Sequence, residues 1–371
     1  MIAGAGLGGL TVAAALARAP DGPRVVVIDP RTRWDNDRTW CFWVPPGDPS
    51  LALAAHRWDR WSVSAGGRRV VRSAAGEVYA QVSGDRVYRD ALDAIAACPR
   101  VVLRRGRVVS TEVGEAGATV VLEDGAITAA TVVDTRPPAL AHAPAAHERR
   151  LLQHFVGWHV RTDRACFDPD VVSLMEFEPS DSVHFTYVLP YTPTEALVED
   201  TWFGAEVHPD ATYADALTAW LTARAGRWEV LRTEQGVLPM TTERFDPHPS
   251  PREWRVGLAG GAARPATGYA FVATRHMAQA VADRVLTGST APLRPLRSER
   301  TELLDGVFLE WMHSAPQRAP EAFLRLFDRV DPGVLVRFLS NRSSVADDLR
   351  VMAALAPVAG PTMLRAVRAR M

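Results

Sequence analysis

Lysine is absent from this chain of 371 residues, and all 42 of its basic residues are arginine. Pyridoxal phosphate enzymes bind their cofactor through a lysine, and kinases and phosphate-loop NTPases also need one, so the sequence excludes these classes. Cysteine is scarce as well. Cys41, Cys98 and Cys166 lie far apart in the sequence and form neither a CxxC pair nor a disulfide framework, which fits a reducing compartment.

Long apolar runs and a strong net charge are also missing. No run reaches about 18 apolar residues, the length that a transmembrane helix needs. The net charge of −1 gives no electrostatic reason to expect nucleic acid. No HExxH motif or other metal-ligand spacing occurs, so we expect no metal. The N-terminus does not resemble a signal peptide, and we expect a cytoplasmic protein.

A nucleotide-binding pattern opens the chain. In "IAGAGLGG", Gly4, Gly6 and Gly9 match GxGxxG; a predicted helix follows, and "RVVVIDP" is then predicted to be a buried parallel strand ending in Asp29. Such glycines let a pyrophosphate approach the helix N-terminus, and the acid accepts a hydrogen bond from a ribose hydroxyl. The stretch predicts a dinucleotide site. Because only three residues precede Gly4, we expect the natural start to lie upstream or the chain to be truncated.

Later segments favour FAD as the dinucleotide. Residues 101–136 alternate as short strands that end in an apolar strand, and residues 254–271 contain a strand, a glycine-rich turn and the start of a helix. Strands that return to the sheet from far along the chain suit a large cofactor. We expect an α/β fold with a Rossmann-like FAD-binding domain (residues 1–150 and 230–300), an antiparallel substrate-binding sheet (151–229) and a C-terminal helical region (301–371).

Several segments together resemble the bacterial-type, FAD-dependent lycopene β-cyclases. They include "GAGLGG", "DNDRTWCFW", "VVDTRP", "YVLPYTPTEALVEDTWF", "TEQGVLPMT" and "ARPATGYAF", and the similarity runs over almost the whole chain. The resemblance implies a glutathione-reductase-like flavoprotein fold. It also implies conversion of the open ends of lycopene into β-rings without net redox change, with FAD in the reduced state and NAD(P)H as the ultimate reductant.

The strand "ALVEDTWF" offers the acid that this chemistry needs. Alternation puts Glu199 on one face with Leu197, Thr201 and Phe203, where burial would raise its pKa and keep a proton available. With the family motif matched here, we predict Glu199 as general acid and base, while a solvated edge position and the reduced flavin as rival proton donor remain open alternatives. Asp200 lies on the opposite face. The full set of predicted catalytic residues is Glu199, Asp200 and Glu176.

"DNDRTWCFW" follows the strand that carries Asp29, so its residues are expected beside the cofactor. Arg38 is expected to pair with a phosphate or the reduced ring, and the aromatic faces to stabilise a cation unless they are ordinary core. The predicted cofactor-binding residues are Gly4, Gly6, Gly9, Asp29, Arg38, Arg89, Asp134, Gly260, Gly261, Thr267 and Gly268. The predicted substrate-binding residues are Trp40, Phe42, Trp43, Phe185, Tyr187, Phe203 and Tyr269.

A lycopene-using chain must touch a bilayer, because lycopene dissolves only in lipid. Residues 303–330 carry apolar side chains at helical spacing, which predicts either peripheral membrane contact or packing on the chain's own core. Two other functions fit the same fold. One is a flavin monooxygenase or polyprenyl reductase, which would consume NAD(P)H with every turnover; the other is a non-catalytic carotenoid- or flavin-binding protein.

Overall fold

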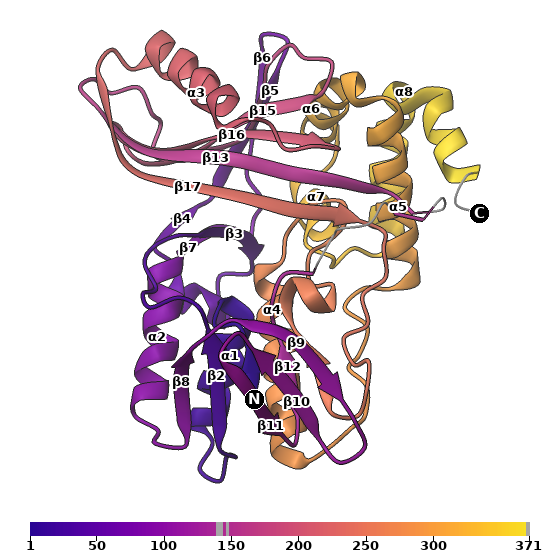
Figure 1. Cartoon of the computed structure of the whole chain (residues 1–371). Coiled ribbons are helices and arrows are strands. Elements are labelled where there is room, and N and C mark those ends of the chain that lie inside the picture. Colours follow the sequence, from indigo (N-terminus) through magenta and orange to yellow (C-terminus); the bar gives the residue numbers. More distant parts are fainter. Residues whose placement is uncertain (139–143, 146–147, 369–371) are drawn as a thin grey trace.

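Two sheets organise the chain, a parallel sheet near the N-terminus and a larger sheet beside the C-terminal helices (Figure 1). The computed structural model describes residues 1–138, 144–145 and 148–368. The mixed α/β architecture confirms the predicted fold class. Within the described ranges, no helix is both long and apolar enough to span a bilayer.

The parallel sheet confirms the nucleotide-binding pattern. Its strand order is β18-β12-β1-β2-β8, and every neighbouring pair is parallel. The strands are β1 (Ile2–Ala3), β2 (Val25–Asp29), β8 (Val101–Arg105), β12 (Val132–Asp134) and β18 (Glu253–Arg255). The helices α1 (Leu7–Arg18), α2 (Gly84–Ala96) and α4 (Phe271–Thr287) pack together with this sheet. Val25 and Val27 of β2 pack with these helices, and Val26 and Ile28 pack on the other face with residues 108–127. Both faces of β2 are therefore buried, which explains its continuous apolar run.

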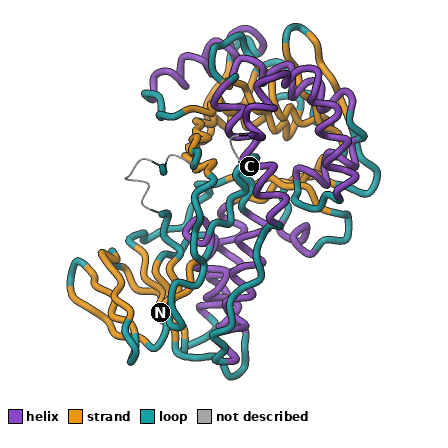
Figure 2. The backbone as a smooth tube through the Cα atoms, turned by 90° about the vertical axis from the view of Figure 1, so that its right-hand side faces the viewer, coloured by secondary structure: helices purple, strands orange, loops and turns teal. Residues whose placement is uncertain are grey.

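Two small antiparallel sheets flank the parallel one. The predicted alternating strands form a meander of β9 (Val108–Val113), β10 (Ala118–Leu122) and β11 (Gly125–Ala129), seen edge-on beside the N-terminus in Figure 2. The second sheet has the order β3-β7-β4, with β3 (Thr39–Val44), β4 (His56–Trp58) and β7 (Val78–Ser83). "DNDRTWCFW" therefore runs from a loop into a strand. A short 3₁₀ turn, η1 (Pro49–Leu53), links β3 to β4.

The large sheet has the order β17-β13-β16-β15-β14-β5-β6, and only the β14–β5 pair is parallel. Its strands are β5 (Arg60–Ala65), β6 (Arg68–Arg72), β13 (Arg150–Thr162), β14 (Val171–Phe177), β15 (Val183–Thr192), β16 (Glu195–Gly204) and β17 (Trp228–Thr241). The predicted boundaries of the substrate sheet, 151–229, differ from this arrangement. Hydrogen bonding to β13 and β14 brings in β17 and β5, which a division by sequence position separates from them.

Helices cover both faces of the large sheet. The helix α3 (Asp210–Arg224) packs on one face, where Val160, Val188 and Val198 join a cluster with Leu217 and Trp220. The C-terminal helices lie against the other face: α5 (Glu299–Ser314), α6 (Ala319–Arg329), α7 (Pro332–Leu339) and α8 (Val345–Arg368). Short 3₁₀ turns, η2 (Gly257–Gly260) and η3 (Pro316–Arg318), precede α4 and α6.

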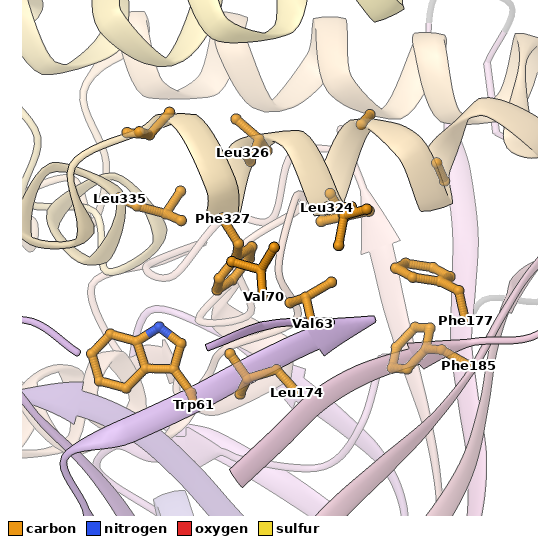
Figure 3. Packing of buried hydrophobic residues seen from close by; sticks show 14 of the residues in the cluster. Trp61, Val63, Val70, Leu174, Phe177, Phe185, Leu324, Leu326, Phe327 and Leu335 are labelled. Carbon is orange, nitrogen blue, oxygen red and sulfur yellow. The ribbon is translucent and has the colours of Figure 1, made fainter. Parts of the chain in front are cut away.

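The C-terminal helices and the sheet share the largest hydrophobic cluster of the described chain. Figure 3 shows Phe327 of α6 above Val63 and Val70, and Phe177 beside Phe185, all buried. The apolar side chains of residues 303–330 point mainly inward, since Trp311, Met312, Phe323, Leu326 and Phe327 are all buried. Packing on the chain's own core, one of the two predicted possibilities, therefore accounts for this apolar pattern.

Candidate active site

A cavity of about 900 Å³ lies between the glycine turn, the large sheet and the C-terminal helices. Its wall at one end is the turn before α1, with Gly4, Gly6 and Gly8. At the other end the wall is apolar and comes from α5, α6 and α8, with side chains that include Phe308, Phe323, Leu326, Phe327, Met352 and Leu355. The cavity thus connects a nucleotide-type turn to a space lined by hydrocarbon.

The glycine turn has the geometry that a diphosphate requires. A Cβ on Gly9 would lie 1.9 Å from the carbonyl oxygen of Gly4, so the helix and the strand end approach as closely as only glycine permits. Gly4 has a φ of 95°, which also favours glycine. Within the described part of the chain no side chain caps α1 at Gly6, and its first N–H groups remain available to an anion. These residues fit the diphosphate of FAD.

Asp29 lies at the end of β2 as predicted, and it is tied to the glycine turn. Its carboxylate accepts hydrogen bonds from the backbone N–H of Ala5 at 2.6 Å and from Nε of Arg31 at 3.0 Å. Burial alone would raise the pKa of Asp29, but these hydrogen bonds outweigh it and the pKa is lowered. Asp29 is therefore an ionised acceptor. Arg31, which also lines the cavity, was not predicted, because an arginine in a loop carries no local signal.

The other predicted cofactor residues divide into two groups. Arg38, Thr267 and Gly268 line the cavity, as does the N-terminus of α4 at Phe271 and Thr274. Arg89 instead pairs with Asp85 on the exposed side of α2.

Three further cofactor predictions miss the cavity by one to four residues. Gly260 and Gly261 lie within and just after η2, and Gly257 and Leu258 line the cavity in their place, because the 3₁₀ turn carries the later glycines away toward Met277 and Phe245. Asp134 is engaged by Arg136 at 2.7 Å, and Thr135 and Arg136 face the cavity instead.

Successive side chains of β3 point alternately toward the cavity and away from it. Thr39, Cys41 and Trp43 face the cavity, and Trp40 reaches it from the start of the strand. Phe42 points the other way and stacks on Phe271 with ring centroids 4.9 Å apart, so its predicted place in the substrate wall is wrong. Trp43 lies edge-on to Tyr269, 5.7 Å between centroids, and both line the cavity.

The predicted acid faces the same cavity. Glu199, Thr201 and Phe203 of β16 line it together with Phe185 and Tyr187 of β15. Burial raises the pKa of Glu199 well above its usual value, and the charge of Glu234 and a hydrogen bond to it raise the pKa further; Arg232 acts in the opposite direction. Burial therefore favours the protonated, neutral form of Glu199 at the wall of the cavity.

Neutral polar groups lie close to Glu199. The hydroxyls of Tyr79 and Tyr187 are 2.9 Å apart, and burial raises the pKa of both phenols. Burial likewise raises the pKa of the Cys41 thiol. None of the three ionises near neutral pH, so Glu199, with Glu234 as its hydrogen-bond partner, is the candidate here for exchanging a proton. The pair was missed from the sequence, because the two glutamates are far apart in the chain.

The remaining predicted acids point away from the cavity. Asp200, on the opposite face of β16, accepts a hydrogen bond from Nε1 of Trp202 at 2.7 Å and contacts Nε2 of His184 at 2.5 Å. Glu176 accepts a hydrogen bond from Nε1 of Trp220 at 3.0 Å. Both carboxylates therefore stabilise the packing on the α3 side of the sheet. In the described ranges no three His, Cys, Asp or Glu side chains gather as a metal site requires.

Comparison with known proteins identifies the family. The family model described as "Lycopene cyclase protein" matches residues 1–366. The chain belongs to the lycopene cyclase family. The lycopene β-cyclase of a Paracoccus species is 28% identical to this lycopene cyclase family member, and the match covers 100% of this chain and 97% of the relative. The lycopene β-cyclase of Pantoea ananas is 23% identical, and the match covers 99% of this chain and 97% of the relative.

Solved structures with the same fold are more distant in sequence. A flavoprotein/dehydrogenase from Cytophaga hutchinsonii matches with a TM-score of 0.62 at 14% identity, covering 96% of each chain. A geranylgeranyl bacteriochlorophyll reductase-like protein from Thermoplasma acidophilum matches with a TM-score of 0.60 at 15% identity, covering 98% of each chain. A halogenase solved in complex with FAD has a TM-score of 0.59 at 12% identity, with 98% of this chain and 84% of the halogenase covered. This lycopene cyclase family member therefore shares its overall fold with these three structures.

Proposed function

We propose that the chain is a lycopene β-cyclase that closes the linear ends of lycopene into β-rings with FAD bound in the reduced state. The observation that carries the proposal is the position of Glu199. Its carboxyl group, whose pKa burial raises, faces a cavity that joins the glycine turn to an apolar end. Family membership, with curated lycopene β-cyclases matched over the full chain, supports the same conclusion.

In the proposed reaction, Glu199 donates its proton to the terminal alkene of the polyene. The π electrons of that alkene form the new C–H bond, and a neighbouring alkene attacks the tertiary cation to form the ring bond. The carboxylate of Glu199 then removes a proton from the ring, whose C–H electrons become the ring double bond. Every proton that is donated is recovered, and no electrons are gained or lost, so the reaction is an isomerisation.

The walls of the cavity suit a carbocation. Water would trap the cation as an alcohol, and the apolar side chains of β15 and the C-terminal helices exclude it. The aromatic faces of Trp43, Phe185 and Tyr269 line the same space, and each such face is worth about 0.5–2 kcal/mol to a desolvated cation. Apolar exclusion and aromatic faces together favour ring closure over hydration.

The residues that would hold FAD lie at or beyond the carboxyl ends of the parallel strands β1, β2 and β18. The glycine turn would bind the diphosphate, Asp29 a ribose hydroxyl, and Arg31 and Arg38 would add positive charge nearby. The N-terminus of α4, which faces the cavity, would favour an anionic ring. When bound in its reduced form, FAD would supply negative charge beside the cationic carbon. NAD(P)H would load the flavin with electrons and would not be consumed once per ring.

The substrate implies contact with a lipid surface. The helices α5 and α8, which line the apolar end of the cavity, also carry the exposed side chains Leu303, Val345 and Leu349. Asp348 of α8 pairs with Arg300 of α5 at 3.1 Å and holds the two helices together. We propose that these helices touch the bilayer from which lycopene enters.

Expression in lycopene-accumulating cells tests the function. A cyclase yields a product of the same mass as lycopene with a different chromatographic retention. A product heavier by oxygen or by hydrogen would instead assign the chain as a monooxygenase or a reductase. Unchanged lycopene that co-purifies with the chain would assign it as a binding protein.

A further inference from the structure

Gly157 lies between two glutamates that no local pattern connects. It is on β13, and it is in register with Glu199 of β16 on one side and with Glu234 of β17 on the other. Residues in register on neighbouring strands point to the same face of a sheet. A Cβ on Gly157 would lie 2.8 Å from Cγ of Glu199 and 3.3 Å from Cγ of Glu234. The missing side chain is what lets the two carboxyl groups meet across the strand.

Glu234 is held on its other side by two donors. Its Oε2 accepts a hydrogen bond from Oγ1 of Thr39 at 2.7 Å and from Nη1 of Arg232 at 2.5 Å. Nη1 of Arg232 also contacts the carbonyl oxygen of Asn36 at 3.1 Å, so the same loop that leads to Arg38 and the cavity fixes the glutamate. The side chain of Glu234 is only 2% exposed. An ion pair with Arg232 and a hydrogen bond from Thr39 therefore fix the carboxylate of Glu234 in place.

The roles of Glu199, Glu234 and Arg232 follow from their charges. The charges of Glu234 and Arg232 cancel in their ion pair, and Glu199 shares a hydrogen bond with Glu234, in which the protonated form of Glu199 is the donor. Once Glu199 has given up its proton, the three groups carry a net charge of minus one beside the nascent cation. Two neighbouring carboxylates repel each other, so the pair regains a proton readily, and Glu199 becomes the better base just when a base is needed.

We propose that Glu234 is the positioning residue for the acid, a fixed carboxylate that orients the proton of Glu199, keeps it in place between turnovers and draws a proton back after ring closure. The proposal rests on Glu199 being the general acid and base of the proposed function. It gives Gly157 a role as well, as the spacer that brings the pair together.

Glu234→Gln tests the proposal, because it keeps the shape and removes the charge. We expect the variant to retain FAD and to cyclise lycopene at least about tenfold more slowly at neutral pH, since each unit of lost pKa elevation lowers the protonated fraction of Glu199 up to tenfold. The alkaline limb of its rate–pH profile should move to lower pH. The other titratable or charged groups that interact with Glu199 are Cys41 of β3, Tyr187 and Tyr191 of β15 and Arg232 of β17, and none of these is altered. Glu229→Gln, on the exposed end of the same strand, is the matched control and should behave as wild type.

Infrared difference spectroscopy gives a readout that does not depend on activity. The band of the protonated carboxyl group that disappears in Glu199→Gln should shift in Glu234→Gln, because the hydrogen-bond acceptor has changed. Gly157→Ala is the second variant if Glu234→Gln does not fold: the methyl group would separate the pair and should produce the same shift and the same change of pH profile.

The outcomes separate the two claims. Full cyclisation by Glu199→Gln would refute the assignment of the acid itself. If Glu199→Gln is inactive but the folded Glu234 variant keeps the wild-type rate, pH profile and infrared band, the positioning role of Glu234 is wrong while the proposed function stands. If Glu234→Gln does not fold, Gly157→Ala takes its place. A wild-type rate–pH profile and a wild-type infrared band in Gly157→Ala would then also refute the positioning role of Glu234.

Discussion

Arg264 and Asp305 form an ion pair that is buried on both sides, with Nη2 and Oδ1 2.8 Å apart and the side chains 6% and 1% exposed. Arg264 also donates a hydrogen bond to the carbonyl oxygen of Phe338. The pair thus fastens the turn before α4, which carries Thr267 and Gly268, to α5 and α7. Because Asp305 and Phe338 line the cavity, the same contacts close it on the side of the C-terminal helices.

Breaking this pair should destabilise the fold. Asp305→Ala leaves a buried guanidinium without its partner, and we expect the free energy of unfolding to fall by about 3–5 kcal/mol. Asp90→Ala breaks the exposed pair with Arg18 and should cost at most about 1 kcal/mol. Urea unfolding measures the free energy of unfolding of both variants. Similar decreases in the two would show that the buried Arg264–Asp305 pair contributes no more to stability than an exposed pair.

Asp29 should control the affinity for FAD. Asp29→Ala removes the acceptor for Ala5 and Arg31 in the glycine turn and the proposed acceptor for the ribose. Each charge-assisted hydrogen bond contributes about 1.5–3 kcal/mol, so the dissociation constant should rise at least about tenfold. Titrating the apoprotein with FAD and following the flavin fluorescence measures this dissociation constant, and Asp124→Ala, at an exposed position, is the control. Unchanged affinity in Asp29→Ala would contradict the placement of the dinucleotide.

His154 should make the fold sensitive to mild acid. Burial lowers the pKa of His154 from 6.5 to about 4, and Nδ1 of this ring is 2.6 Å from the hydroxyl of Tyr213. Between these pH values the unfolded chain binds a proton on His154 that the folded chain does not, so stability is lost as the pH falls through this window. The loss reaches about 3 kcal/mol. Other groups titrate there too, so the test is the difference between wild type and His154→Gln, which should lose this part of the pH dependence.

The apolar end of the cavity should admit the polyene. Leu326→Trp would fill part of the space lined by α6, and we expect cyclisation to fall at least about tenfold with FAD content unchanged, since overpacking of a tight space costs about 1–3 kcal/mol. Leu286→Trp, at an exposed position near the C-terminal end of α4, should leave the rate unchanged. Equal cyclisation rates in wild type and Leu326→Trp would show that the polyene does not bind at this end of the cavity.

Local patterns carried much of the sequence-based interpretation. The glycine turn, Asp29 and the inward face of β16 each follow from spacing within one element, and the structure places them as predicted. Phe42 was misplaced, although alternation along a strand predicts its direction, because a cluster of aromatics was treated as one wall. Gly260 and Gly261 were misplaced because Gly257 and the glycine pair three residues later look equally suited to a close approach until the path of the turn is known.

Contacts between residues far apart in the chain could not be predicted from the sequence. Glu199 and Glu234 are neighbours only because β16 and β17 both pair with β13, and this strand order is not encoded in any single segment. For the same reason β5 and most of β17 fell within the predicted bounds of the FAD-binding domain, although both strands pair with the large sheet. Arg264 and Asp305 likewise meet only after the C-terminal helices have packed against the turn before α4.

The central claim is that Glu199 supplies and recovers the proton. Its most direct test is the cyclisation of lycopene by purified Glu199→Gln with reduced FAD, compared with wild type and with Glu195→Gln near the start of the same strand. We predict a loss of about 10²–10⁴-fold in the rate of ring formation for Glu199→Gln, with flavin content and the unfolding midpoint unchanged, and wild-type rates for Glu195→Gln. Ring formation by Glu199→Gln at the wild-type rate would contradict the account.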